Sequence, residues 1–184
     1  GARNTREDAY GGDLEGRSRV IHEVISAVRA RTHTGFQVGL RLSAERFGLD
    51  LDEMVRLATA VLARGDLDYL DLSLWDVTKL PAGAEGGPLL IDHFLGLPRN
   101  DTALGVAGRI TGAAEARAVL DRGADLAFVG KAAIVDRDFA RHAIGDPDYE
   151  APAFPVTRDH LRSQLVGEPF VKYFANGWAQ LVSD

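Results

Sequence analysis

The chain has 184 residues with 27 acidic and 21 basic side chains, a formal net charge of −6, and 46% of its residues are hydrophobic. This composition suits a globular domain with one sizeable core, and the acidic balance argues against nucleic acid or an anionic membrane surface as the main partner. The sequence has no cysteine, which excludes disulfides, thiolate nucleophiles and iron–sulfur clusters within it. It shows neither an apolar run of membrane-spanning length nor a signal-peptide pattern, so we expect a cytoplasmic protein.

The first part of the sequence predicts helices and strands in alternation. After Asp13, a typical N-cap residue, apolar side chains recur every three or four positions, which indicates an amphipathic helix. The runs FQVGLRLS and LDYLDLS are typical of strands, the second with apolar residues at alternate positions, and Gly65 closes the helix between them. In chain order we expect a helix at residues 14–30, a strand at 36–43, a helix at 52–64 and a strand at 67–73.

The alternation resumes after a long loop, residues 75–101, that is rich in glycine and proline. Thr111 is the expected N-cap of the next helix, and Gly123 is expected to close it. We expect a strand at 102–107, a helix up to residue 122, a strand at 126–130, a short helix after residue 136, and two helices at 158–165 and 168–182.

Short apolar strands that alternate with helices predict an α/β fold with a parallel sheet. An open doubly wound sheet and part of a TIM (β/α)8 barrel both fit, but a whole barrel needs about 250 residues and eight strands, and four strands are predicted here. We expect a single domain over residues 1–184, with the strand–helix repeats in residues 1–150 and a C-terminal helical tail in residues 151–184.

The last two predicted strands share a pattern that points to a ligand. In both architectures ligands bind at the C-terminal ends of the strands. These strands end in Gly108-Arg109 and in Gly130-Lys131. Glycine lets backbone N–H groups approach a phosphate closely, and the adjacent cation neutralises its charge. A single pair of this kind favours a tight turn beside a solvated cation, but two at neighbouring strand ends favour a phosphate site.

Two other side chains leave alternatives open. Arg41 lies within an apolar strand, where it either forms a structural ion pair with a neighbouring carboxylate such as Asp71 or faces an electron-rich ligand atom. Trp75, at a strand end, could stack on a planar ligand, although packing in the core is the simpler expectation. The five histidines show no metal-ligand spacing, and no Ser/His/Asp set emerges, so no metal site and no catalytic residue is predicted.

Three segments together resemble the old yellow enzyme family, the NADH:flavin oxidoreductases. Residues 4–29, NTREDAYGGDLEGRSRVIHEVISAVR, resemble the N-x-R-x-D-x-YGGS-x-ENR-x-R-F motif of that family. VGLRLS, residues 38–43, resembles the fifth strand of its barrel. Residues 105–139, from GVAGRIT to DRDF, are similar to its seventh and eighth strands.

The resemblance implies an FMN-binding barrel that passes hydride from NADH or NADPH through the flavin to an activated alkene or similar small-molecule acceptor. It implies that Arg41 contacts the flavin ring near N1 and O2. It further implies that Gly108, Arg109, Gly130 and Lys131 contact the FMN phosphate. Lys131 departs from the usual arginine of the family, which keeps the charge but loses the bidentate fork.

The resemblance also implies that strands one to four lie outside this chain, together with the residues that bind substrate and donate a proton. We therefore expect the C-terminal half of a barrel, strands five to eight, which needs an N-terminal half-barrel or a complementary chain and forms a homo-oligomer. Two alternatives stay open: a non-catalytic half-barrel fragment that pairs with another chain, and a flavin-free phosphate-binding barrel enzyme.

Overall fold

Four parallel strands form the central sheet of the computed structural model, which describes residue 1 and residues 3–183. The strands pair in chain order and without stagger, so that Arg41, Asp71 and Gly105 lie side by side on three neighbouring strands. The α/β fold with a parallel sheet predicted from the alternation is thereby confirmed. The strands are β1 (Gly39–Ser43), β2 (Tyr69–Ser73), β3 (Ala103–Ala107) and β4 (Leu126–Phe128).

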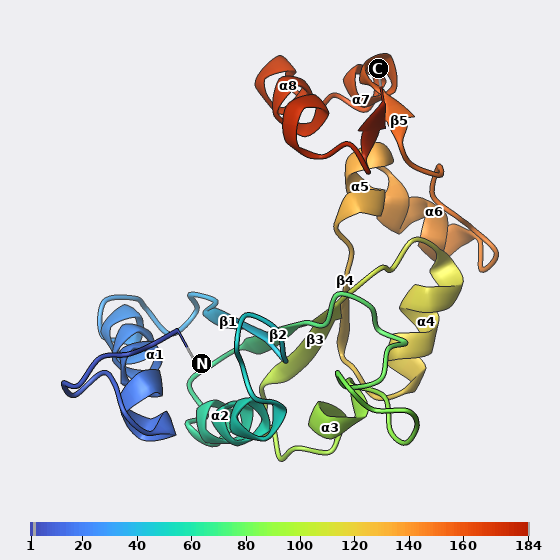
Figure 1. The fold of residues 1–184 in the computed structure, drawn as a ribbon. Helices are drawn as coiled ribbons and strands as arrows, with labels where there is room; N and C mark the ends of the chain where they lie inside the picture. The colour runs from blue at the N-terminus through green and yellow to red at the C-terminus, as the bar shows by residue number, and fades with distance from the viewer. Residues whose placement is uncertain (2, 184) are drawn as a thin grey trace.

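Helices cover one side of this sheet (Figure 1). Their ends follow local rules: Asp13 accepts a hydrogen bond from the Gly16 backbone N–H at the start of the first helix, and Gly65 and Gly123 take left-handed backbone conformations just past the ends of two others. The four helices are α1 (Leu14–Arg29), α2 (Leu51–Ala63), α3 (Asp92–Leu95) and α4 (Ala113–Asp121).

The prediction that Thr111 caps α4 is wrong. Gly112 is the N-cap residue, and no side chain caps the helix. Instead, the first backbone N–H of the helix, that of Ala113, donates to the carbonyl oxygen of Tyr149 at 2.8 Å. A Cβ on Gly112 would lie 2.7 Å from that same oxygen, so the close approach of the Tyr149 backbone explains why a glycine replaces the expected hydroxyl cap.

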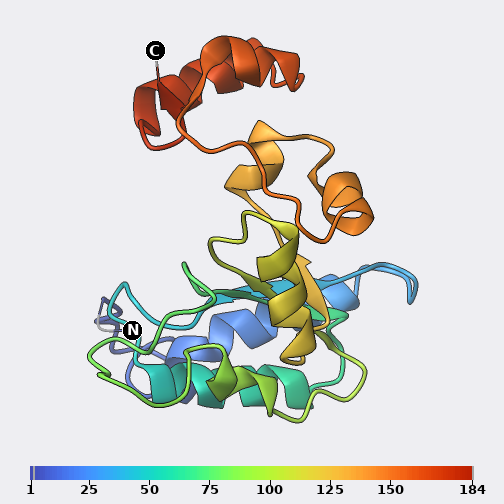
Figure 2. The same cartoon turned by 90° about the vertical axis from the view of Figure 1, so that its right-hand side faces the viewer.

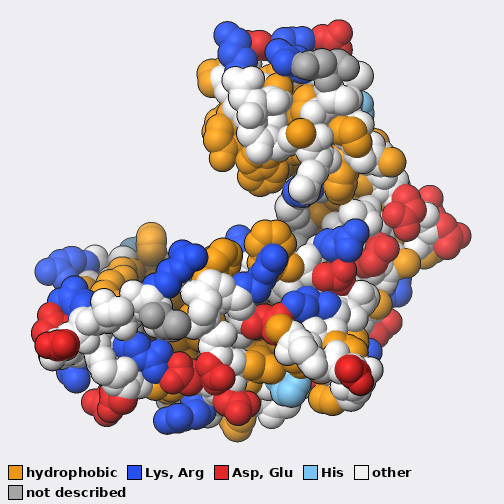
Figure 3. All heavy atoms as spheres, in the orientation of Figure 1, with side chains coloured by type: hydrophobic (Ala, Val, Ile, Leu, Met, Phe, Trp, Pro, Cys, Tyr) orange, Lys and Arg blue, Asp and Glu red, His pale blue; other side chains and the backbone are white. Residues whose placement is uncertain are grey.

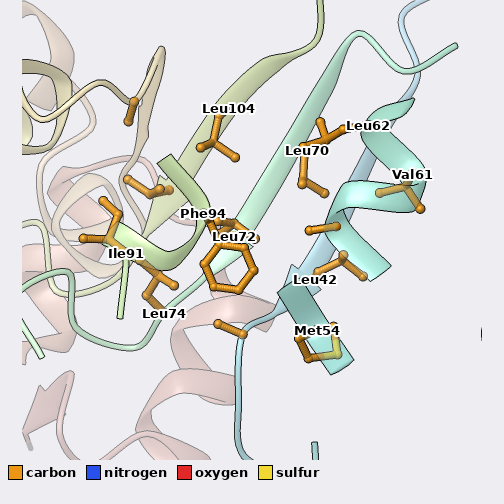
Figure 4. Packing of buried hydrophobic residues seen from close by; sticks show 14 of the residues in the cluster. Leu42, Met54, Val61, Leu62, Leu70, Leu72, Leu74, Ile91, Phe94 and Leu104 are labelled. Carbon is orange, nitrogen blue, oxygen red and sulfur yellow. The ribbon is translucent and has the colours of Figure 1, made fainter. Parts of the chain in front are cut away.

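The core lies between the sheet and the helices (Figure 4). Leu70 and Leu72 of β2 are fully buried there, whereas Asp71 between them points to the opposite face, as alternation along a strand requires. The segment predicted as a long loop contains α3, whose Phe94 is also fully buried in this core. Four helical residues are too few to show a helical period, which is why the sequence pattern missed α3.

After β4 the chain builds a C-terminal lobe on the side of the sheet opposite α1, α2 and α3 (Figures 1 and 2). The lobe has its own cluster of buried apolar residues, among them Val135, Leu161 and Leu181. The last predicted helix ends five residues early, at Gly177 instead of residue 182, because the chain turns there into a short strand. The lobe contains α5 (Lys131–Val135), α6 (Phe139–Gly145), β5 (Val156–Thr157), α7 (Arg158–Ser163), α8 (Glu168–Gly177) and β6 (Val182–Ser183).

Across the part of the chain that the structure describes, no helix combines the length and the apolar character needed to cross a bilayer.

We expect the substitution Leu72→Ala to lower the free energy of unfolding by about 2–5 kcal/mol, because it leaves a cavity in a packed interior. Chemical denaturation followed by circular dichroism measures this change. Leu126→Ala is the matched control, since Leu126 on β4 is 39% exposed, and it should change the free energy of unfolding by about 0.5 kcal/mol or less. Equal losses at the two positions would contradict the core described above.

Candidate functional site

A cavity of about 760 Å³ lies at the C-terminal ends of the strands, between the sheet and the C-terminal lobe. Figure 3 shows the lobe overhanging the rest of the molecule, with a hollow between the two. The cavity brings together every residue that the sequence predicted as cofactor-binding. Its lining includes Arg41, Gly108, Arg109, Gly130 and Lys131.

Arg41 projects from β1 into this space, and its side chain is 61% exposed. Its Nε lies 3.4 Å from Oδ2 of Asp71, and its Nη2 donates to the hydroxyl oxygen of Ser73 at 3.1 Å. The two alternatives left open by the sequence are therefore compatible. The guanidinium forms the ion pair with the neighbouring strand and still presents its other N–H groups to the cavity.

Arg109 follows β3 and is held by Asp76, which follows β2. Nη1 of Arg109 lies 3.2 Å from Oδ2 of Asp76, and the other carboxylate oxygen accepts hydrogen bonds from the backbone and hydroxyl groups of Thr78. Burial raises the pKa of Asp76, but the hydrogen bonds from Thr78 and Arg109 outweigh it and hold the pKa below its ordinary value. Asp76 is thus an ionised anchor that leaves the Arg109 side chain 77% exposed.

The two glycines of the predicted pattern serve different purposes. A Cβ on Gly108 would come within 2.7 Å of the Asp76 backbone nitrogen, so this glycine allows the loops after β2 and β3 to touch. A Cβ on Gly130 would meet no heavy atom of the described residues within 4 Å. The backbone at Gly130 therefore faces open space in the cavity, as close approach of a phosphate requires.

Lys131 is flanked by the C-terminal lobe. Its Nζ lies 5.9 Å from the ring centroid of Phe154 and 5.7 Å from that of Trp178, both within cation–π range. The side-chain carbonyl oxygen of Gln180 is 3.5 Å away. Sequence reasoning missed Phe154 and Gln180 as cavity residues, because they come from a segment that reads only as a linker and a helix.

The expectation that Trp75 packs in the core is wrong. Trp75 is 54% exposed, lines the cavity and has a left-handed backbone with φ of 68°. The guanidinium carbon of Arg46 lies 3.9 Å from its ring centroid, so a cation–π contact holds the indole at the cavity rim. This placement leaves a stacking role toward a planar ligand open.

The cavity also contains a carboxylate with one oxygen that finds no hydrogen-bond partner in the described part of the chain. Glu115, in the first turn of α4, lines the cavity, and its Oε2 is buried with no hydrogen-bond partner among the described residues. The cavity wall carries three cations, Arg41, Arg109 and Lys131, against two carboxylates, Asp76 and Glu115, and Asp76 is already paired with Arg109. Three cations beside exposed backbone fit an anionic ligand with a phosphate group.

Comparison with known proteins identifies the family. Residues 1–146 match the family model described as the NADH:flavin oxidoreductase / NADH oxidase family, and the chain therefore belongs to this family. The chain is 34% identical over 141 residues to the probable NADH-dependent flavin oxidoreductase YqiG of Bacillus subtilis, covering 72% of this chain and 38% of that protein. It is 30% identical over 154 residues to an NADPH dehydrogenase of the same organism, covering 82% of this chain and 45% of the relative.

A solved structure supports the same assignment. The fold matches morphinone reductase with a TM-score of 0.62 and 28% sequence identity, covering 86% of this chain and 41% of that one. These findings confirm the resemblance to the old yellow enzyme family. The chain spans less than half the length of each of these three relatives.

We expect Asp76→Asn to lower the free energy of unfolding by about 0.5–1.5 kcal/mol at neutral pH, because it removes a charged hydrogen-bond acceptor. The pKa of Asp76 is lowered from 3.8 in the folded protein, so its ionised form stabilises the fold above that value. The difference between wild type and variant should shrink as the pH falls below about 4. Urea denaturation over a pH series measures it, and Asp148→Asn, at an exposed position, is the control. A difference that does not vary with pH would contradict this role of Asp76.

Proposed function

We propose that this chain supplies the FMN-phosphate half-site of a barrel enzyme that passes hydride from NADH or NADPH to an activated alkene or similar small-molecule acceptor. One observation carries the proposal. The cavity brings together Gly108-Arg109 and Gly130-Lys131 from two adjacent strand ends. Family membership is the reason for proposing flavin as the ligand, and the cavity is the proposed position of its phosphate.

The proposed phosphate position lies between Arg109 and Lys131. Both side chains line the cavity and are held by one polar partner each, at 3.2 Å and 3.5 Å, so each keeps N–H groups for a ligand. The open space beside Gly130 leaves room for the phosphate to approach the backbone. Charged hydrogen bonds to phosphate are about twice as strong as neutral ones, so these two cations would dominate phosphate affinity.

The proposed ring position lies beside Arg41. A bound flavin supplies the hydride-transfer chemistry, and a cation near its N1 and O2 edge favours the anionic reduced form. Arg41 is suited to this role because it lies on the cavity face of β1 and is fixed there by Asp71 and Ser73. Trp75 at the rim offers a flat surface for a planar group, whether flavin, nicotinamide or acceptor.

We also propose that four further strands close this sheet into a barrel. Among the described residues, β1 and β4 each pair with only one neighbour in the sheet, so both edges are open. The sheet face opposite the helices carries Arg41 and Asp71, side chains suited to a lined interior. The missing strands would come from the N-terminal part of a longer polypeptide or from a complementary chain, and would bring the residues that bind the acceptor and donate a proton.

Removing either phosphate cation should weaken FMN binding selectively. We expect Arg109→Ala and Lys131→Ala each to raise the dissociation constant for FMN about 10- to 100-fold, as the loss of a charged hydrogen bond predicts. Riboflavin lacks the phosphate, so its affinity should change little. Fluorescence titration of both flavins against this chain together with its complementary half measures the effect. Arg141→Ala is the control, since Arg141 is 82% exposed in α6 of the lobe. Equal losses for FMN and riboflavin would contradict a phosphate site.

Expressed alone, the chain should self-associate through its open edges and uncovered sheet face, because unpaired strand edges template further pairing. Adding the complementary half should convert these assemblies into one defined species. Analytical ultracentrifugation distinguishes the two states. A stable monodisperse species of 19.8 kDa would contradict the need for closure.

A further inference from the structure

Asp71 is a charged residue in an interior position. It lies in the middle of β2, opposite Arg41 on one side and Gly105 on the other. Its side chain is only 11% exposed, and Oδ1 is buried with no hydrogen-bond partner among the described residues. A Cβ on Gly105 would collide with the ring of Phe128, so that ring covers the position next to Asp71 and helps to exclude water from it.

This carboxylate is costly to the fold. Burial of a charged group without full hydrogen bonding is unfavourable, and one oxygen of Asp71 lacks a partner among the residues described. Burial raises the pKa of Asp71, and the charge of Arg41 offsets this only in part. Stabilisation of the sheet therefore does not explain Asp71, because a neutral side chain of similar size would serve the packing better.

The position of Asp71 does explain how the Arg41 side chain is oriented. A long arginine side chain on an open sheet face has many rotamers, and Arg41 is 61% exposed. Two contacts from β2 restrain it: Asp71 Oδ2 at 3.4 Å from Nε, and the hydroxyl oxygen of Ser73 at 3.1 Å from Nη2. Both partners lie on the same face of β2, two residues apart. They contact the edge of the guanidinium formed by Nε and Nη2, so the opposite edge remains available to a ligand in the cavity.

We propose that Asp71 is a positioning residue for Arg41, holding the guanidinium in the orientation that receives the flavin ring. The inference rests on the proposed function, because that function assigns Arg41 to the flavin. Asp71 itself does not touch the ligand and acts only through Arg41. Its effect on flavin binding must therefore disappear when Arg41 is removed.

A double-mutant cycle tests this dependence in the protein that contains both this chain and the complementary half of the barrel. We expect Asp71→Asn to raise the dissociation constant for FMN about tenfold while leaving the free energy of unfolding unchanged or higher, since the buried charge is gone. In an Arg41→Gln background, Asp71→Asn should cause no further loss of FMN affinity. Asp92→Asn, which breaks the ion pair with Arg122 outside the cavity, is the control and should leave FMN affinity unchanged. An equal effect of Asp71→Asn with and without Arg41 would overturn the proposal, as would no effect at all.

A second measurement does not depend on flavin or on the folding of the Arg41 variant. In the ligand-free protein, the NMR order parameter of the Arg41 Nε–H bond should fall in Asp71→Asn, because the ion pair that restrains the guanidinium is lost. An unchanged order parameter would overturn the positioning role. If the wild-type protein binds no flavin while the order parameter still responds to Asp71, the proposed function fails and the restraint of Arg41 by Asp71 stands.

Discussion

The unstaggered register of the parallel strands β1, β2 and β3 is the constraint on which the site depends. It sets Arg41 beside Asp71 and brings the strand ends to one edge of the sheet. As the middle strand, β2 can offer partners on both sides: Asp71 to Arg41 of β1, and Asp76, just beyond its end, to Arg109 of the β3 loop. Two of the three cavity cations are therefore held by carboxylates that a single strand and its loop supply.

The third cation shows how the lobe joins the site. Lys131 is both the residue after the glycine at the end of β4 and the first residue of α5, so the lobe begins at the cation itself. Instead of a carboxylate, it has the rings of Phe154 and Trp178 beside it. A cation that faces aromatic rings keeps its full charge for an anion, whereas a cation in an ion pair is partly neutralised. The lobe thus helps to determine how strongly Lys131 could attract a phosphate.

The position of the cavity cations was largely predictable from the sequence, because it depends on backbone topology alone. Glycine–cation pairs at the ends of neighbouring parallel strands meet at one edge whatever their side chains do, so the sequence predicted their meeting. Trp75 was not predictable, because its exposure depends on a left-handed backbone and on Arg46, and apolar content by itself favours the core. Phe154 and Gln180 were not predicted as cavity residues, because their segment reaches the cavity only through the folding of the lobe. The strands β5 and β6 have two residues each and are too short to show a sequence period.

The proposed closure of the barrel and the proposed ligand site reinforce each other physically. Arg41 lies on an open sheet face, where solvent screens its charge. Strands that cover this face would lower the local dielectric and strengthen the attraction of Arg41 both to Asp71 and to an anionic flavin. A ligand that binds the closed form better than the open one stabilises closure by the same free energy. The carboxylate of Asp71 fits this setting, because an arginine that closure would bury needs a paired anion.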